Sequence, residues 1–543
     1  MGLLFMKLNG LKLPEYVRYN YCAQTSRASE FSRRIVLISD THISTDDNSS
    51  FNTMMFRKGM AEIKKIKNVD YIIHLGDLTH DGTYLEYQIA EDLLRAIPKD
   101  NFYIIPGNHD SRNVGYLLYE DIFGPRSFKI DDEELFILGV DSSIPDQNPG
   151  HIGKRTIEHV GEQFARNQDK IKVFCFHHQS IPIPLTGRER SAVYDGGDVL
   201  EMALSSDVDL ILNGHRHVTN IYSCTKGKKD LVLFNSGTFS CNKTRYTEQF
   251  SFTVLDINEK MAKFTTKLLM SGEEINRKRY LGRFFSNKCP AERDRIARLI
   301  HIGNTHFSSD DYDQEIFNAG TRKINALKPN LVVHTGSLTY NNEPEEYVIA
   351  KKEMQKIKCP ILMLPGGKDL IKYRWDLYEN QMDLLESKFE NQHLKVLGIN
   401  TIDPHIAHGH VGRRKLHNKM KALNNNGNGK VKIIALNHRL IPPPKIRYEK
   451  ILTDSGAILK DLTDPENAIN VVLMGKNNIG FSMQLEECIL SYCGSVCSKD
   501  VVEFGTHEFN IIDFYSNGFT SVKSYNIESA KTKLIGEFWI KKN

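Results

Sequence analysis

Short runs of apolar residues recur along the first half of the chain, and each is followed by a turn and by polar residues. The runs have the length and the β-branched or aromatic content of buried strands: Ile35–Ile38, Tyr71–Leu75, Phe102–Ile105, Val173–Phe176 and Leu210–Leu212. Stretches with helical spacing lie between them, for example Glu86–Ile97. This alternation predicts an α/β fold that binds its ligands at the carboxyl ends of the strands.

The second half of the chain repeats this pattern. IVLISDTHISTDD, which ends at Asp47, is similar to RLIHIGNTHFSSDD, which ends at Asp311, and four further pairs of segments follow in the same order. The offset between paired positions stays close to about 260 residues. A near-constant offset indicates two copies of one fold.

The repeat predicts a division into domains, which also agrees with the length of the chain, because 543 residues are too many for one hydrophobic core. We expect an N-terminal extension at 1–33, a first domain at 34–270, a linker at 271–297 and a second domain at 298–543. The linker is charged and has few strand signals. Its basic residues Arg277, Lys278 and Arg279 are expected to form a solvated face, with a phosphate contact as the alternative.

Charge and cysteine content narrow the class of protein. The 71 basic and 67 acidic residues leave a net charge of +4, which does not indicate binding to nucleic acid or to an anionic membrane. No apolar run is long enough to cross a bilayer, and the first residues resemble a signal peptide poorly. The nine cysteines are scattered, which favours reduced thiols and a cytoplasmic location.

Metal-ligand residue types follow five predicted strands at the same end, where a binding crevice is expected. They are Asp40, His42, Asp77, Asn108, His177, His215 and His217. Imidazole, carboxylate and amide groups favour two ions of iron, manganese, zinc or cobalt over calcium, and the set contains no thiolate. Asp77 is the candidate shared ligand. Two such ions would bring the pKa of a water between them toward neutrality and clamp a phosphoryl group.

Three neighbours of these residues are candidates for supporting roles. His109 is placed to donate a proton to a leaving oxygen, and Asp110 to orient it. His178 and Asp110 are each expected either to support a ligand or to be purely structural. Any one of these residues alone would more often be a cap or a satisfied polar group, but ligand types at five strand ends together favour a site.

The five motifs resemble those of the calcineurin-like metallophosphoesterases. The family pattern D-x-H, G-D, G-N-H-[DE], a lone His and G-H-x-H stands here as Asp40-Thr-His42, Gly76-Asp77, Gly107-Asn-His-Asp110, His177 and Gly214-His-Arg-His217. The resemblance spans about Arg34 to Met270. It implies a four-layer αββα sandwich, one metal on Asp40, His42, Asp77 and His217, a second on Asp77, Asn108, His177 and His215, and His109 as acid or charge stabiliser.

Within the family, LGVDSSIPDQNPGHIG and FHHQSIP look most like the cyclic-nucleotide and glycerophosphodiester phosphodiesterase branch. That branch usually has two prolines where this chain has Gln179 and Ser180. Carried onto the second half, the pattern fails, because the ligand positions hold Asn304, Ser337, Gly367, Asn437, Lys476 and Asn478, and Lys368 replaces His109. Only His306 survives, so we expect a degenerate copy that keeps the fold.

These observations predict a phosphodiesterase that uses two divalent metal ions and hydrolyses a small phosphodiester such as a cyclic nucleotide. A phosphomonoesterase or nucleotide pyrophosphatase on the same site is the alternative. A nuclease is disfavoured because no basic, aromatic-rich face is visible. The second half is expected to cover apolar surface of the first. A binding, regulatory or dimerisation module is the alternative of another class, and a homodimer stays open.

Overall fold

The computed structural model describes most of the chain. The described residues are 31–45, 50–95, 97, 101–184, 186, 192–227, 230–245, 248–281, 290–307, 312–373, 375–382, 385–403, 408–424, 429–445, 451–476, 479–498 and 505–540. Almost all of the expected N-terminal extension at 1–33 lies outside these ranges, as does Asn478.

The first half begins with a six-stranded sheet in the order β12-β11-β10-β1-β2-β3. Its strands are β1 (Arg33–Ile38), β2 (Tyr71–His74), β3 (Phe102–Ile104), β10 (Ser251–Ile257), β11 (Met261–Leu268) and β12 (Glu274–Tyr280). Three helices pack on its outer face: α2 (Thr53–Ile63), α3 (Tyr84–Leu94) and α4 (Gly115–Phe123). Helix α3, expected at Glu86–Ile97, starts at a capping box in which Thr83 and Glu86 bind each other's backbone N–H groups.

A second sheet covers the inner face of the first. In the first half it has the order β4-β5-β6-β7-β9-β8, with β4 (Phe128–Asp131), β5 (Leu135–Gly139), β6 (Ile171–Cys175), β7 (Leu210–Asn213), β8 (Asn220–Thr225) and β9 (Asp230–Asn235). Apolar side chains from both sheets form the core between them. Helices α5 (Lys154–Arg166) and α6 (Gly196–Ser205) cover the outer face of the second sheet. The predicted four-layer αββα sandwich is therefore confirmed.

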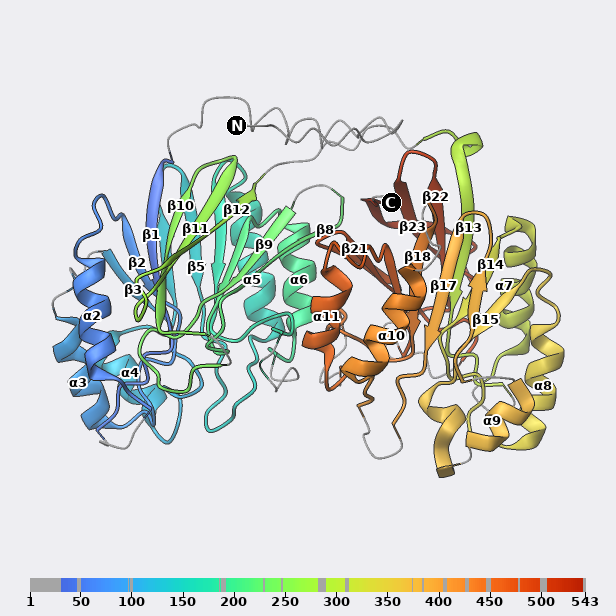
Figure 1. The fold of residues 1–543 in the computed structure, drawn as a ribbon, viewed down its shortest axis with the longest axis horizontal. Helices are drawn as coiled ribbons and strands as arrows, with labels where there is room; N and C mark the ends of the chain where they lie inside the picture. Colours follow the sequence, from blue (N-terminus) through green and yellow to red (C-terminus); the bar gives the residue numbers. More distant parts are fainter. Residues whose placement is uncertain are drawn as a thin grey trace.

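The second half has the same strand order as the first, element for element. Its outer sheet runs β15-β14-β13-β22-β23-β24, with β13 (Arg295–Ile302), β14 (Leu331–His334), β15 (Ile361–Met363), β22 (Glu508–Tyr515), β23 (Phe519–Asn526) and β24 (Thr532–Trp539). A short 3-10 helix (Glu292–Asp294) precedes it. Helices α7 (Gln314–Leu327), α8 (Pro344–Met354) and α9 (Trp375–Met382), with a 3-10 helix (Gly367–Tyr373), lie outside this sheet (Figure 1).

The inner sheets of the two halves join into one twelve-stranded sheet. The second half contributes β16 (Lys388–Glu390), β17 (Leu394–Ile399), β18 (Val431–Leu436), β19 (Val471–Met474), β20 (Phe481–Leu485) and β21 (Cys488–Tyr492), and α10 (Arg413–Asn424) and α11 (Ser455–Thr463) cover them. The junction is an antiparallel pairing of β20 with β8 in which Leu485 lies opposite Cys224. Helices α6 and α11 lie side by side in the middle of the molecule, and one apolar cluster draws residues from both halves (Figure 1).

The linker prediction for 271–297 is wrong over Glu274–Tyr280. These residues form β12, which pairs antiparallel with β11 along its length. Their alternation of exposed and half-buried positions is that of an edge strand, which tolerates charge and carries no continuous apolar run. Arg279 does not lie on a solvated linker face either, because its guanidinium is 3.4 Å from the Glu486 carboxylate of the second half.

A glycine at the contact between halves provides a test of this packing. A Cβ on Gly197 in α6 would lie 2.2 Å from the backbone carbonyl of Pro443, whereas a Cβ on Gly161 in α5 would meet only the flexible Met202 and Ser206 side chains. We expect Gly197→Ala to lower the free energy of unfolding by about 1–3 kcal/mol through overpacking. Gly161→Ala should raise it by roughly 0.5–1 kcal/mol, since alanine favours a helix interior. Thermal unfolding of both variants measures the difference, and equal melting temperatures would contradict the contact.

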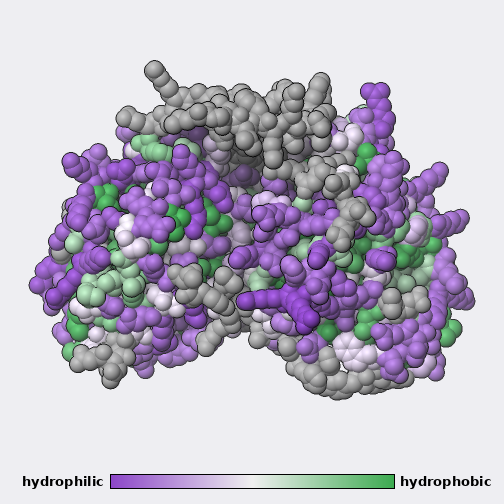
Figure 2. Space-filling model, viewed as in Figure 1, coloured by the Kyte–Doolittle hydropathy of each residue, from purple (hydrophilic) through white to green (hydrophobic). Residues whose placement is uncertain are grey.

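Among the described helices, none combines the length and the apolarity needed to cross a bilayer. Figure 2 shows a face that is mostly hydrophilic, with apolar residues scattered among polar ones. The predicted cytoplasmic location stays a prediction.

Candidate metal centre

The predicted ligands sit on strained turns at the carboxyl ends of the strands. Asp40, His42, Asp77, His215 and His217 all have positive φ, between 49° and 70°. A residue with a Cβ occupies this region at a cost of order 1–3 kcal/mol, and such strain concentrates at functional sites. The strain indicates that the turns are shaped to direct side chains inward at this edge of the two sheets.

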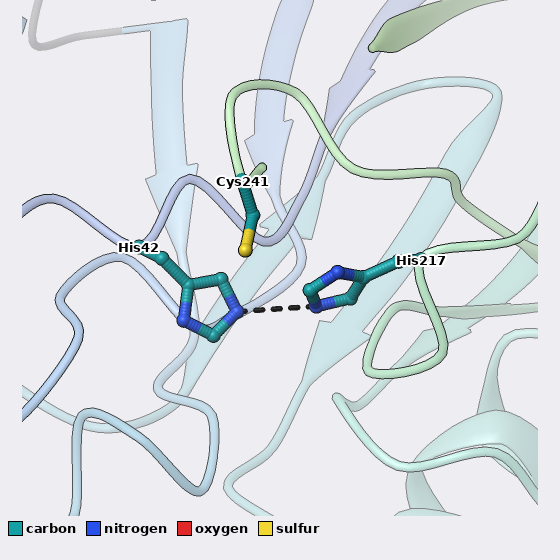
Figure 3. A group of neighbouring side chains, drawn as sticks. All are labelled: His42, His217 and Cys241. Carbon is teal, nitrogen blue, oxygen red and sulfur yellow. Dashed lines mark hydrogen bonds between the residues drawn. The ribbon is translucent and has the colours of Figure 1, made fainter. Parts of the chain in front are cut away.

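Four of the predicted ligands form one compact cluster of buried side chains. One ligand atom from each of Asp40, His42, Asp77 and His217 lies within 4.8 Å of those from the other three. The Nε2 atoms of His42 and His217 approach each other to 3.1 Å (Figure 3). The Nδ1–H of His217 donates to the carbonyl of Lys243, 2.9 Å away, which leaves Nε2 as the atom that faces the carboxylates.

A second cluster shares Asp77 with the first. Asp77, His177 and His215 also present ligand atoms within 4.8 Å of one another. The Nε2 of His177 is 3.3 Å from Oδ2 of Asp77, and its Nδ1–H donates to the carbonyl of Leu75 at 2.8 Å. Asn108 joins this group, with its Oδ1 3.0 Å from Nδ1 of His215. The structure thus brings all seven predicted ligand residues together, with Asp77 in both clusters.

The donor set fits divalent cations. Three buried atoms that face the clusters have no hydrogen-bond partner among the described residues: Oδ1 of Asp40 and the Nε2 atoms of His177 and His215. Burying such polar atoms without a partner is costly, and a cation, which would displace any proton on the imidazoles, would satisfy them. Asp40, His42, Asp77 and His217 would hold one ion, and Asp77, Asn108, His177 and His215 the other.

The electrostatics of the pocket also favour positive charge. Burial opposes protonation of His177, but the nearby carboxylate of Asp77 outweighs it and raises the pKa of this imidazole to about 9. Burial likewise opposes protonation of His217, and the Asp40 carboxylate still raises its pKa to about 10. A field that holds protons on buried imidazoles attracts divalent cations more strongly, and metal binding would displace those protons.

Of the roles considered for Asp110, the structure favours the structural one over orientation of His109. The carboxylate of Asp110 is fully buried and accepts hydrogen bonds from the backbone N–H groups of Leu78, Thr79 and Gly107, at 2.8–3.0 Å. It therefore links the turn after β2 to the turn after β3, which fixes the position of Asp77 relative to Asn108. Short carboxylates commonly bind backbone N–H groups in this way, and the sequence motif alone does not distinguish that role from contact with a neighbouring ring.

His109 is oriented by other groups. Its Nδ1–H donates to the carbonyl of His80 at 2.6 Å, and its Nε2 is 3.1 Å from a guanidinium nitrogen of Arg112. The ring lies edge-on to His42, with the ring centroids 4.4 Å apart. Burial lowers the pKa of His109 to about 4, against the opposing effect of Asp77. His109 thus borders the first cluster, as predicted, with a cationic neighbour that the sequence analysis did not single out.

His178 packs against the ligands without facing the clusters. Its Nδ1 accepts from the hydroxyl of Ser142 at 2.9 Å and its Nε2–H donates to the carbonyl of Asn148 at 3.1 Å. Its ring centroid is 4.5 Å from that of His215. Burial lowers the pKa of His178 to about 3, so this ring is neutral. Of the two roles considered, the geometry favours support of a ligand.

Three residues near the clusters were missed by the sequence analysis: His80, Arg112 and Cys241. The Nδ1 of His80 lies 3.3 Å from Nδ1 of His42. The thiol of Cys241 forms a close group with the imidazoles of His42 and His217, and Figure 3 shows its sulfur directed toward the space between the two rings. His80 and Arg112 stand within three residues of a motif, which is a usable signal. Cys241 follows His217 by a strand pair, and no local pattern links the two.

The comparisons with known proteins agree with this geometry. Residues 33–219 match the family model of the calcineurin-like phosphoesterases. This segment belongs to that family. Calcineurin-like phosphoesterases use two divalent metal ions, and the cluster of Asp40, His42, Asp77 and His217 is a candidate site for one of them. The first half of the chain is thus a metallophosphoesterase, a hydrolase of phosphoric esters.

The chain is similar to curated proteins over about a third of its length. A protein of Arcobacter nitrofigilis, named a probable glycerophosphodiester phosphodiesterase GpdQ, is 29% identical over 209 residues, which are 37% of this chain and 76% of that one. A protein of Vesicomyosocius okutanii, named a probable cyclic nucleotide phosphodiesterase, is 27% identical over 34% of this chain and 78% of its own. Among solved structures, a purple acid phosphatase of yellow lupin (Lupinus luteus) superposes with a TM-score of 0.37 and 10% identity, over 54% of this chain and 59% of that one.

Proposed function

We propose that the first half of the chain is a dinuclear phosphodiesterase that hydrolyses a small phosphodiester such as a cyclic nucleotide. The observation that carries the proposal is the position of Asp77, which belongs to two separate groups of buried imidazoles. A carboxylate in that position can neutralise two neighbouring cations at once. The names of the relatives support a diester as substrate. The two ions, when bound, supply electrostatic activation of water and of the phosphoryl group.

The chain's own residues would position and protonate the substrate. His109 borders the first cluster, and we assign it to the leaving oxygen. Burial keeps its pKa near 4, so it would protonate that oxygen or stabilise it by charge only when the negative charge of the bound phosphate raises this pKa. Arg112, whose guanidinium adjoins the ring, adds positive charge at the same edge, where it would attract a phosphate oxygen. Asp110 keeps the two turns in place through its backbone hydrogen bonds, and His178 holds the ring of His215 from behind.

Replacement of His109 tests these roles. We expect His109→Gln to lower kcat by about 10²–10⁴-fold, the usual contribution of a positioned acid, while both metals stay bound. If His109 donates a proton, the loss is larger for a cyclic nucleotide, whose leaving group is an alkoxide, than for bis(p-nitrophenyl) phosphate. Similar losses on both substrates would indicate charge stabilisation instead. Lys368→Gln, at the corresponding position of the second half, is the matched control and should keep full activity.

A substrate panel separates the diesterase from its alternatives. The metal-reconstituted protein is compared on bis(p-nitrophenyl) phosphate, p-nitrophenyl phosphate, cyclic nucleotides and a nucleotide with a pyrophosphate bond, with Asn108→Ala as the inactive control. We expect the diesters to be hydrolysed faster than the monoester. A preference for the monoester or for the pyrophosphate bond would reject the diesterase proposal and leave the metal site intact.

We further infer that the second half is a degenerate copy of the first. Its turns keep the strained backbone, since Asn304, His306, Ser337 and Lys476 have positive φ between 48° and 58°, although most of the ligand types are gone. Asp369 binds the backbone N–H groups of Leu338 and Thr339 as Asp110 does in the first half. The shared sheet and core support the simpler of its expected roles, the covering of apolar surface.

A further inference from the structure

We propose that Cys241 is an additional ligand, through its Sγ, of the metal held by Asp40, His42 and His217. The ligand atoms of Cys241, His42 and His217 lie within 4.8 Å of one another, and none of the three residues is more than 5% exposed. Figure 3 shows the sulfur close to the two rings, above the line that joins their Nε2 atoms. The proposal rests on the metal-dependent function proposed for this site.

A second observation, an unpartnered buried carboxylate oxygen, indicates that this pocket would bind a cation. The Oδ1 of Asp40, fully buried, has no hydrogen-bond partner among the described residues and lies 3.2 Å from Nε2 of His217. A thiol is only a weak hydrogen-bond donor, and Sγ of Cys241 lies close to the two imidazoles rather than to this oxygen, so the thiol does not satisfy it. A divalent ion would satisfy the carboxylate, the two imidazoles and the thiolate together. On binding, the thiol would release its proton to solvent as the sulfur lone pair forms the bond to the metal.

The loop that carries Cys241 is hydrogen-bonded to the D-x-H turn. The Thr238 hydroxyl donates to the carbonyl of Asp40 at 2.7 Å, and the Ser240 hydroxyl donates to the carbonyl of Thr41 at 2.9 Å. The backbone N–H of Cys241 donates back to the Thr238 hydroxyl at 2.9 Å. The position of the thiol is therefore set by the same turn that carries two of the ligands, which is what a ligand requires.

The surroundings of Cys241 differ from those of a cysteine that serves as a small apolar side chain. Cys175, Cys224 and Cys488 each belong to an apolar cluster. Within the described part of the chain, Cys241 belongs to none of these clusters, although it is fully buried. Buried cysteines are most often inert packing groups, so a thiol that lies against two imidazoles instead requires another explanation.

The second half provides an internal comparison. Cys241 forms an isolated bridge with Phe51, and the corresponding bridge of the second half joins Tyr312 to Ser498. The hydroxyl of Ser498 lies 3.0 Å from Nδ1 of His306, the one imidazole kept among the ligand positions of that half. Where most of the ligand types are lost, the thiol is replaced as well, and the hydroxyl interacts with the imidazole directly.

A thiolate would change which metals the site prefers. Sulfur is a softer donor than the oxygen and nitrogen atoms of the other ligands, so it favours zinc over manganese or magnesium at this position. It also adds a negative charge to the pair of carboxylates, which would reduce the positive charge available at this ion. We therefore expect the two positions of the centre to differ in metal preference, with zinc held more tightly at the one that includes Cys241.

X-ray absorption of the full-length protein loaded with zinc alone tests the proposal. We expect a sulfur shell at about 2.3 Å in the unaltered protein, its loss in Cys241→Ser, and its retention in Cys224→Ser, which alters a buried cysteine outside the site. Zinc affinity should fall by at least about tenfold in Cys241→Ser, the least that loss of a supporting contact costs. A zinc-loaded protein with only nitrogen and oxygen neighbours overturns the proposal, and so does a sulfur shell that survives in Cys241→Ser.

The readout is independent of substrate, which keeps this proposal separable from the proposed function. A protein that shows the sulfur shell but hydrolyses no phosphodiester would reject the diesterase proposal alone. A protein that hydrolyses diesters without a sulfur neighbour on zinc would reject the role of Cys241 alone.

Discussion

Asp77→Asn is expected to abolish phosphodiester hydrolysis, with a loss of at least about 10³-fold in kcat/KM. The carboxylate is the one group that belongs to both clusters, so its loss removes a charged ligand from each of two ions. The amide keeps the shape of the side chain but not the negative charge that offsets the repulsion between two cations. Activity on bis(p-nitrophenyl) phosphate and the metal content per chain measure the effect, and both are expected to fall.

The second half supplies a matched control for this substitution. Ser337 stands at the corresponding strand end, with the same positive φ as Asp77. Ser337→Ala should leave activity and metal content unchanged, since the second half is proposed to take no part in catalysis. An Asp77→Asn protein that binds two metals per chain and hydrolyses the diester at the normal rate would contradict the shared-ligand assignment.

The first half is expected not to fold as an isolated fragment. A chain that ends at Leu281 loses β20, which pairs with β8, and the apolar side chains that α10 and α11 contribute to the common core, among them Leu416 and Leu459. Each large apolar side chain buried in a core contributes about 1.5–3 kcal/mol, and a protein of ordinary stability has a total of about 5–15 kcal/mol. Loss of several such contacts would therefore exceed the stability of the remaining domain.

Expression of the fragment alone should accordingly give aggregated protein. Co-expression of residues 1–281 with residues 290–543 is the control, and it should recover a soluble complex, because the contacts between the halves do not require a covalent link. A fragment 1–281 that is monodisperse, has a native near-ultraviolet circular dichroism spectrum and is fully active would contradict this role of the second half. That result would equally remove support for a regulatory or lid role.

Much of the site could be predicted because its ligands directly follow strands. Asp40 and His42 come after β1, Asp77 after β2 and Asn108 after β3, so the order of motifs along the chain already specifies which strand ends present metal-ligand types. The carboxyl ends of neighbouring parallel strands lie at one edge of a sheet. The convergence of these side chains therefore follows from local patterns and from one rule of α/β folds.

The errors arose where the outcome depends on contacts between distant segments. Strand β12 carries the charge of an edge position, so its local sequence is that of a solvated segment, and only its pairing with β11 makes it a strand. One role considered for Asp110 is to orient its sequence neighbour His109, but its carboxylate binds the backbone of Leu78 and Thr79, about thirty residues earlier. Cys241 is absent from every motif and reaches the site because its loop binds the D-x-H turn.

The sequence by itself determined the layered α/β fold, the seven ligand candidates and the loss of their counterparts in the second half. Hydrophobic periodicity and residue type predict these features. The burial of a continuous segment and the chemistry of a ligand side chain are both local properties of the sequence. Only the tertiary structure decided that Asp77 lies between two groups of imidazoles, that a thiol joins one of them and that a single sheet and core unite the halves. These features are distances between atoms hundreds of residues apart in the chain, and packing, which no local pattern encodes, sets them.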